Sequence, residues 1–198
     1  MKLFFAGASP FVAKVRMAAE LAEVPLELVA VDVTQPNLEL KTANPLSKIP
    51  TLLTDEGLGL FDSRVITRHI DRVSGNRLYP TSPSQLQAAE LCEALCDGIN
   101  DSAVGCIYER RFRPEEIVHQ PWIDRLWGKV ESGLNMMDGR LAPLGDGADI
   151  TTVCFAATLG YLDFRFAGQW RDQVPQLSDW MDQFDASHPN LSALKPKG

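Results

Sequence analysis

The chain has 198 residues, of which 45% are hydrophobic and 23% charged, and its formal net charge is −7 at pH 7. This composition is typical of a globular protein with a sizeable core and argues against a disordered chain. An acidic balance with dispersed basic residues argues against nucleic-acid binding, and no apolar run approaches the roughly 20 residues that span a bilayer. A small anionic ligand stays possible, since it responds to local charge. The first residues resemble a strand rather than a signal peptide, so we expect a cytoplasmic protein with no nucleic-acid or membrane partner.

The cysteines give no sign of a metal centre. Cys92, Cys96, Cys106 and Cys154 contain no C-x-x-C pair, and no histidine lies at zinc-ligand spacing from them. Cys92 and Cys96 lie one helical turn apart, which permits a disulfide or a metal corner. Reduced, buried cysteines are the favoured interpretation, and we expect no bound metal.

The first eighty residues alternate between strand and helix patterns. In chain order we expect a strand over 2–5, a helix over 10–22, a strand over 26–33, a weaker helix over 37–43, strands over 49–53 and 59–61, and a helix over 62–73. This order implies a mixed sheet with helices packed on it.

Residues 79–84 interrupt this alternation with two prolines, two serines and a threonine. Such a segment indicates a linker, so we expect one domain over 1–78 and a second over 85–198. No strand pattern recurs in the second part, which is predicted to hold helices over 85–111, from 121 to about 141, over 150–166 and over 176–187. The helix over 150–166 is apolar nearly all round, which predicts a buried central helix. Four tryptophans on helical stripes are expected in the core: Trp122, Trp127, Trp170 and Trp180.

Ser9 and Pro10 stand between the first strand and the first helix. Serine is a good N-cap and proline suits the first helical turn. A helix N-terminus also stabilises a nearby anion, so Ser9 is either a cap alone or part of an anion site. A thiol with a pKa of ~8.5 is only about 3% ionised at pH 7, and lowering that pKa by about two units takes roughly 2.7 kcal/mol. A hydrogen bond to a charged group (~1.5–3 kcal/mol) and a helix terminus (~0.3–1 kcal/mol) can supply this.

Two further segments carry candidate binding residues. Ile49 and Pro50 lead into a strand, where the proline is either a trans edge residue or part of a cis peptide. A cis bond would turn the Ile49 N–H and C=O outward to pair with an extended peptide ligand. Asp62 and Ser63 precede a helix, where they either cap it or hold a carboxylate.

The order Ser9-Pro10, then Asn44-Pro45 with Lys48-Ile49-Pro50, then Asp62-Ser63 resembles the glutathione site of the glutathione transferase superfamily. The resemblance covers the whole chain and extends to poorly characterised bacterial serine-type members. It implies a thioredoxin-like N-terminal domain and an all-helical C-terminal domain. In the second half, Ala148-Asp149-Ile150 resembles the family's capping motif, with Asp149 at the third helical position and Asp146 as N-cap.

The resemblance also implies roles for the site residues. Ser9 would activate the thiol of glutathione, and Ile49, before a cis Pro50, would pair with its cysteinyl part. Asp62 and Ser63 would hold the γ-glutamyl end and Lys48 would approach the glycyl carboxylate, although the family usually carries Glu or Gln where Asp62 stands. Four residues would border the pocket of the second substrate: Phe11, Tyr108, Arg111 and Phe112. The alternative for the last three is a solvated helix end.

The expected function is a glutathione transferase of detoxification, in which bound glutathione attacks a small hydrophobic electrophile. Glutathione acts as co-substrate, and the family resemblance implies a homodimer. Two alternatives remain: a glutathione-binding interaction module without turnover, and a glutathione-dependent isomerase or dehalogenase.

Overall fold

The structure is a computed structural model that describes residues 1–139 and 147–198. Its first part contains β1 (Lys2–Phe5), α1 (Pro10–Leu21), β2 (Glu27–Ala30), α2 (Leu38–Ala43), β3 (Thr51–Leu53), β4 (Gly59–Leu60) and α3 (Ser63–Val73). The strands form one sheet in the order β2-β1-β3-β4, in which β1 runs parallel to β2 and antiparallel to β3. This is the thioredoxin-like arrangement, which confirms the predicted fold of the first part.

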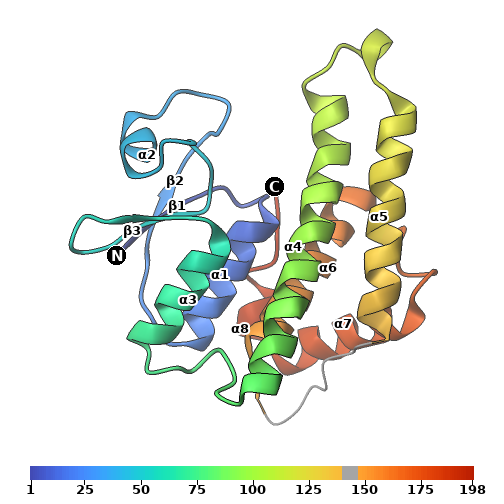
Figure 1. Cartoon of the computed structure of the whole chain (residues 1–198). Coiled ribbons are helices and arrows are strands. Elements are labelled where there is room, and N and C mark those ends of the chain that lie inside the picture. The colour runs from blue at the N-terminus through green and yellow to red at the C-terminus, as the bar shows by residue number, and fades with distance from the viewer. Residues whose placement is uncertain (140–146) are drawn as a thin grey trace.

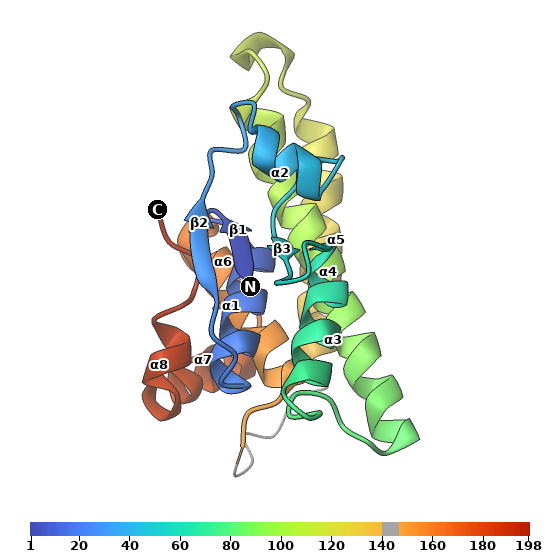
Figure 2. The same cartoon turned by 90° about the vertical axis from the view of Figure 1, so that its left-hand side faces the viewer.

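The second part contains helices and no strand among its described residues. It contains α4 (Pro83–Arg111), a short 3-10 turn over Glu115–Ile117, α5 (Gln120–Asp138), α6 (Ile150–Phe166), α7 (Pro175–Ser187) and α8 (Pro189–Ser192). Figure 1 shows α4 and α5 as a long antiparallel hairpin that extends beyond the sheet, with α6 behind it and α7 across its base. Figure 2 shows α1 between α3 on one side and α7 and α8 on the other.

The predicted element boundaries lie close to the observed ones, and the sequence analysis missed two short elements. The helix over 150–166 has the predicted bounds, while the strand predicted over 49–53 begins only at Thr51. One reason is that Pro50 has no N–H to give to a ladder. The sequence analysis missed the 3-10 turn over Glu115–Ile117 and α8, because pieces of three and four residues are too short to show a period.

Side-chain caps fix where several helices begin. The Ser9 hydroxyl accepts the amide of Val12 at 3.3 Å at the start of α1. Asp149 and Thr152 form a reciprocal capping box at the start of α6, with the Thr152 amide donating to the Asp149 carboxylate at 3.0 Å. The predicted place of Asp149 at the third helical position is therefore wrong, because Asp149 is itself the N-cap. Asp146, the predicted cap, lies outside the described residues.

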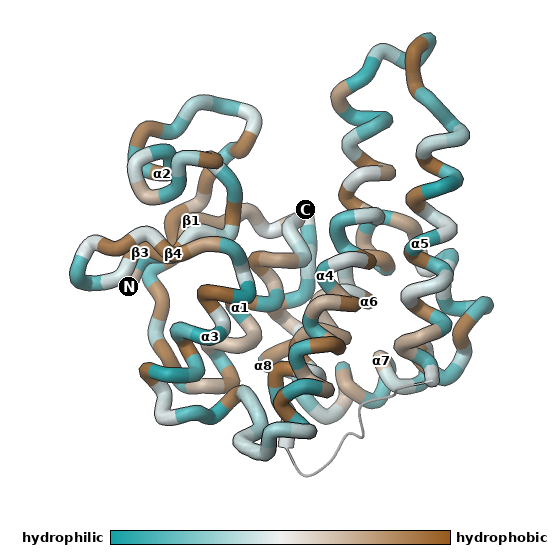
Figure 3. Tube along the Cα trace, viewed as in Figure 1, coloured by the Kyte–Doolittle hydropathy of each residue, from teal (hydrophilic) through white to brown (hydrophobic). Residues whose placement is uncertain are grey.

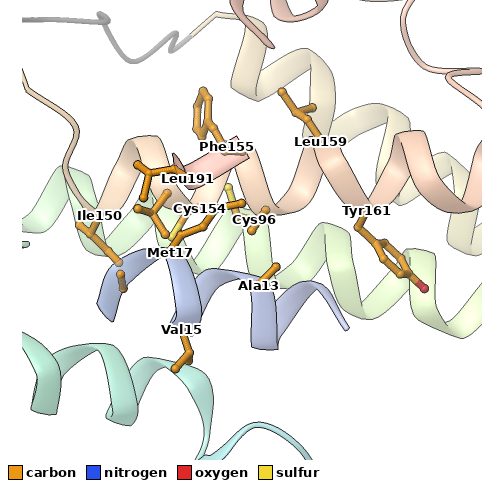
Figure 4. Packing of buried hydrophobic residues seen from close by; sticks show 14 of the residues in the cluster. Ala13, Val15, Met17, Cys96, Ile150, Cys154, Phe155, Leu159, Tyr161 and Leu191 are labelled. Atoms are coloured by element: carbon orange, nitrogen blue, oxygen red, sulfur yellow. The ribbon is translucent and has the colours of Figure 1, made fainter. Parts of the chain in front are cut away.

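One hydrophobic cluster runs through both parts of the chain. It joins Leu3 of β1 to Met17 of α1, Cys154 and Phe155 of α6, and Leu191 of α8. Figure 4 shows α1 side chains packed against those of α6, and Figure 3 shows hydrophobic stretches of these helices gathered where they meet. Residues of α6 from Ile150 to Leu162 are buried except Thr151, which confirms the predicted central helix.

Three of the four tryptophans predicted for the core are buried or half-buried, and the fourth is exposed. Trp170 and Trp180 are buried and Trp127 is half-buried. The core prediction is wrong for Trp122, which is 43% exposed because it lies in the first turn of α5, near the tip of the α4–α5 hairpin. Trp170 lies in the turn after α6 rather than on a helical stripe. The cysteines are all unpaired, and only Cys92 is partly exposed.

A buried charge network ties α1 and α3 to α4. The Lys14 ammonium donates to Asp97 at 2.7 Å and 2.9 Å and to Glu93 at 3.1 Å. The Tyr79 hydroxyl donates to Glu93 at 2.8 Å, and Arg64 Nε lies 3.1 Å from Asp97 Oδ2. Burial opposes the charged form of Lys14, but Cys154, Asp97 and Glu93 around it outweigh burial and leave its pKa raised. The two parts of the chain are therefore joined by ion pairs as well as by apolar packing.

Candidate functional site

A cavity of about 410 Å³ opens between the N-terminal end of α1, the loop before β3, the second half of α4 and the end of α6. A volume of this size suits a small-molecule ligand. The structure brings together in its wall most of the residues predicted for the site: Ser9, Phe11, Lys48, Ile49, Tyr108, Arg111 and Phe112. Segments far apart in the sequence thus meet at one place.

Ser9 presents a hydroxyl at the N-terminus of α1. Its oxygen accepts the Val12 amide, which leaves the O–H group to donate to another partner. Pro10 occupies the first helical position, where its missing N–H costs nothing. The positive end of the α1 dipole and a donor hydroxyl therefore meet at the cavity wall, which suits a small anion such as a thiolate.

The loop before β3 is held by a buried amide. Asn44 Nδ2 donates to the Lys48 carbonyl at 3.1 Å and to Thr51 Oγ1 at 3.0 Å, and Thr51 Oγ1 donates to the same carbonyl at 2.7 Å. The Ile49–Pro50 peptide is cis, as expected from the resemblance. Ile49 lies outside the strand ladders, and its main-chain groups take no part in the backbone hydrogen bonds of residues 1–139 and 147–198. Its main chain is therefore available at the cavity wall.

Pro50, Asp62 and Ser63 do not line this cavity. Pro50 is buried behind its wall, and Asp62 is the exposed N-cap of α3, where its Oδ1 accepts the Arg64 amide at 3.1 Å. The N-terminus of α3 nevertheless lies near one end of the cavity, because its residues Asp62 and Arg64 affect the pKa of Asp101, an α4 residue that lines the cavity. Burial raises the pKa of Asp101 and the nearby Asp62 carboxylate adds to this, against the effects of Lys48 and Arg64.

Several lining residues were missed by the sequence analysis. Asp101 and Val104 share one stripe of α4 with Tyr108 and Arg111, and Ile107 lies beside them. The helical period around Tyr108 contained that signal. Val33, from the loop after β2, also lines the cavity.

Tyr161 and Arg165 reach the cavity from α6, and the sequence analysis gave neither of them a place in the site, since that place depends on how α6 packs against α1. Tyr161 is buried, and Figure 4 shows its ring leaving α6 near the N-terminal end of α1. Burial raises the pKa of Tyr161 to about 12, against the opposing effect of Arg165. The guanidinium carbon of Arg165 lies 4.3 Å from the centroid of the Phe164 ring. This end of the cavity therefore combines aromatic rings with a cation.

Residues 1–139 and 147–198 contain neither a group of metal ligands nor a membrane-spanning helix. No three histidine, cysteine, aspartate or glutamate side chains among them are grouped as metal ligands. None of the helices in that part is long and apolar enough to cross a membrane.

Two protein-family descriptions match the chain. "Glutathione S-transferase, N-terminal domain" matches residues 8–73, and "Glutathione S-transferase, C-terminal domain" matches residues 120–183. The first span contains Ser9, the loop before β3 and the start of α3, and the second contains α5 and α6.

Known proteins resemble the chain over nearly its whole length. A glutathione transferase family member from Pseudomonas fluorescens Pf-5 with bound glutathione is 34% identical, covers 100% of this chain and 99% of its own, and has a TM-score of 0.92. A second structure from that organism, with bound S-(propanoic acid)-glutathione, is 33% identical over 100% of both chains with a TM-score of 0.87. The uncharacterized GST-like protein YibF of Escherichia coli (strain K12) is 29% identical over 182 residues, which are 89% of this chain and 90% of that protein.

Proposed function

Because the chain belongs to the glutathione S-transferase family, we propose that it binds glutathione at Ser9 and transfers the glutathione sulfur to a small electrophile. The observation that carries the proposal is the Ser9 hydroxyl, which lies at the N-terminus of α1 in the cavity wall with its O–H free to donate. Glutathione bound in the Pseudomonas fluorescens relative supports the choice of ligand.

The reaction needs a thiolate, which Ser9 and the α1 terminus stabilise together. The thiol proton leaves to solvent, and the sulfur then forms a bond to an electrophilic carbon. The electron pair of the broken bond departs with a leaving group such as halide, or moves to the neighbouring carbon of an activated double bond, which takes a proton from water. The protein contributes a lowered thiol pKa and the positions of the two reactants.

The main chain of Ile49, preceding Pro50, pairs with the cysteinyl part of glutathione in this proposal. Lys48 binds the glycyl carboxylate, while Asp62 and Ser63 bind the γ-glutamyl end beside Asp101. The support is that the Ile49 main-chain groups are unused within the described chain and that Lys48 lines the cavity.

The second substrate binds against Phe11, Tyr108, Arg111 and Phe112, which line the same cavity. In this proposal residues 1–78 form the glutathione domain, 79–84 the linker and 85–198 the domain of the second substrate. The conjugate S-(propanoic acid)-glutathione in the second Pseudomonas fluorescens structure supports a reaction that joins glutathione to another molecule.

The proposal includes a cytoplasmic homodimer with a role in detoxification. Four unpaired cysteines suit a reducing compartment. Exposed Leu91 of α4 and Met136 of α5 line a second hollow, formed by the first half of α4, the end of α5 and the start of α6, and suit burial against a second copy. Light scattering after size exclusion measures the oligomeric state, and a monomer at all concentrations refutes the dimer.

The test of the function is Ser9→Ala, with Ser9→Thr as the variant that keeps a hydroxyl. Calorimetry gives glutathione affinity, ultraviolet thiolate absorbance gives the pKa of the bound thiol, and chlorodinitrobenzene gives turnover. We expect Ser9→Ala to bind glutathione but to raise the bound thiol pKa and lower turnover at least tenfold, as loss of a hydrogen bond worth about 1.5–3 kcal/mol requires.

Two other results would contradict parts of this proposal. Glutathione binding without turnover of chlorodinitrobenzene or a haloalkane by the native protein identifies an interaction module. Unchanged turnover in Ser9→Ala removes Ser9 from the mechanism.

A further inference from the structure

Two arginines of the helical part line the cavity. Arg111 comes from the last turn of α4 and Arg165 from the last turn of α6. The two helices are far apart in sequence, so the fold alone brings these two arginines to the same cavity. Aromatic and aliphatic residues of α4 and its C-cap line the same cavity: Val104, Ile107, Tyr108 and Phe112.

Neither arginine has a carboxylate partner within the described part of the chain. No ion pair within 4.0 Å involves them there, in contrast to Arg113, which lies just beyond α4 and whose Nε lies 2.7 Å from Glu109 of that helix. The Nε of Arg165 is fully buried and has no hydrogen-bond partner among the described residues. Because that atom has no exposed surface, a ligand in the cavity reaches Arg165 through the terminal nitrogens of its guanidinium group.

Arg111 affects the pKa of one acidic residue of the first domain, Asp32. Its pKa is lowered chiefly by hydrogen bonds from Thr34 and least by Arg111. The Asp32 Oδ1 atom already accepts the Thr34 amide at 2.8 Å and the Thr34 hydroxyl at 2.7 Å. The Asp32 carboxylate thus acts on Arg111 only from beyond ion-pair distance within the described residues.

Arg111 lies far along α4 from the residues proposed to bind the two ends of glutathione. The pKa of Asp101 is affected by Lys48, Arg64 and Asp62, all from the first domain. Arg111 follows Asp101 by ten residues on α4, which places it about 15 Å farther along the helix axis at 1.5 Å per residue. An anion at Arg111 thus belongs to the second substrate rather than to the glycyl or glutamyl end of glutathione.

We propose that Arg111 and Arg165 bind a carboxylate of the second substrate, which makes the acceptor class small electrophilic carboxylic acids. This inference rests on the proposed glutathione transfer. A planar guanidinium offers paired N–H donors that match a carboxylate, and the surrounding rings cover the carbon skeleton. For a halogenated acid the carbon–sulfur bond forms as the carbon–halogen bond breaks and halide leaves. For an unsaturated acid the electron pair moves to the carbon beside the carboxylate, which takes a proton from water.

Calorimetry with two conjugates tests the inference independently of turnover. S-(2-carboxyethyl)glutathione and S-(2-carbamoylethyl)glutathione differ only in a carboxylate against an amide. The native protein is expected to bind the acid about tenfold more tightly than the amide, as one charge-assisted contact predicts. The preference falls to about twofold or less in Arg111→Gln and in Arg165→Gln.

Arg110→Gln is the matched control. Arg110 is adjacent to Arg111 and carries the same charge, but it donates to Gln120 at 2.7 Å and does not line the cavity. Its variant keeps the full preference for the acid. Arg165→Lys, which keeps the charge and most of the stem, retains an intermediate preference and serves if Arg165→Gln unfolds.

Equal affinity for the two conjugates in the native protein overturns the inference while leaving glutathione binding intact. An unchanged preference in Arg111→Gln and Arg165→Gln, or an equal loss in Arg110→Gln, also overturns it. Failure of glutathione and both conjugates to bind overturns the proposed function together with this inference.

Discussion

Replacing Lys14 by methionine removes the central cation of the buried network. Methionine keeps an unbranched stem of similar length, so the change is mainly one of charge. Lys14 is 2% exposed and contacts Asp97 and Glu93, which are themselves buried. The variant leaves both carboxylates in place without their shared partner.

The size of the effect follows from what remains. Removing one member of a buried ion pair costs about 3–5 kcal/mol. Arg64 still lies 3.1 Å from Asp97 and the Tyr79 hydroxyl still donates to Glu93 at 2.8 Å, so we expect the lower end, about 3 kcal/mol. This is a large share of the 5–15 kcal/mol that stabilises a typical folded protein.

The loss depends on pH with a definite sign. Burial already raises the pKa of Asp97, and loss of Lys14 removes a group that lowers it. A carboxyl with a raised folded pKa favours the native state when protonated, and that stability is lost as pH rises through the folded value. The deficit of Lys14→Met is therefore smaller near pH 5 than near pH 8.

Urea unfolding followed by tryptophan fluorescence measures these free energies. Lys14→Met combined with Glu93→Gln should recover part of the loss. The double variant has no charge at position 93, and the remaining buried carboxylate, Asp97, still pairs with Arg64. Lys2→Met is the surface control, since Lys2 Nζ lies 3.9 Å from Glu27 and 3.8 Å from Glu39 in exposed pairs, and it should cost less than about 1 kcal/mol. A cost for Lys14→Met as small as that of Lys2→Met would refute the reasoning.

Three further changes probe packing, capping and titration, each by its unfolding midpoint. Gly133→Ala should destabilise the protein by about 1–3 kcal/mol, because its new methyl would lie 2.4 Å from Ile99 Cγ1. Gly128→Ala, with open space around it, should stabilise the protein by about 0.5–1 kcal/mol. Equal effects of the two substitutions would contradict the α4–α5 packing. Asp149→Ala should cost about 1 kcal/mol by removing the capping box of α6, and no change would show that the box is dispensable. Burial raises the pKa of Tyr79, so stability should fall as pH rises above about 10, where the unfolded phenol ionises; Tyr79→Phe should show a shallower fall, and identical slopes would refute this.

Local chemistry predicted the elements that the sequence defines by itself. Ser9 and Pro10 marked the start of α1, and the apolar run from Ile150 marked α6 with its true bounds. Ile49 was a candidate because a proline follows it, which is also a local feature. By contrast, α8 has only four residues, so no period could show it.

The parts that the sequence did not predict depend on tertiary placement. Trp122 has a helical context like that of Trp180, yet its turn of α5 lies near the hairpin tip, beyond the reach of the core. Arg165 is one basic residue at a helix end, which alone suggests only a favourable place relative to the helix dipole. Its role at the cavity follows from where the end of α6 meets α4, which no spacing in the sequence encodes.

The packing of α1 against α6 gives the fold a shared middle layer. Ala13 and Met17 from the first part and Cys154 and Tyr161 from the second belong to one continuous cluster. A chimera that takes residues 1–78 from a relative would therefore place the relative's α1 side chains against this α6. The two sets of side chains would still have to pack together. Successful exchange of halves would require co-transferring the facing residues, so the two parts behave as co-adapted pieces of one folding unit rather than as independent modules.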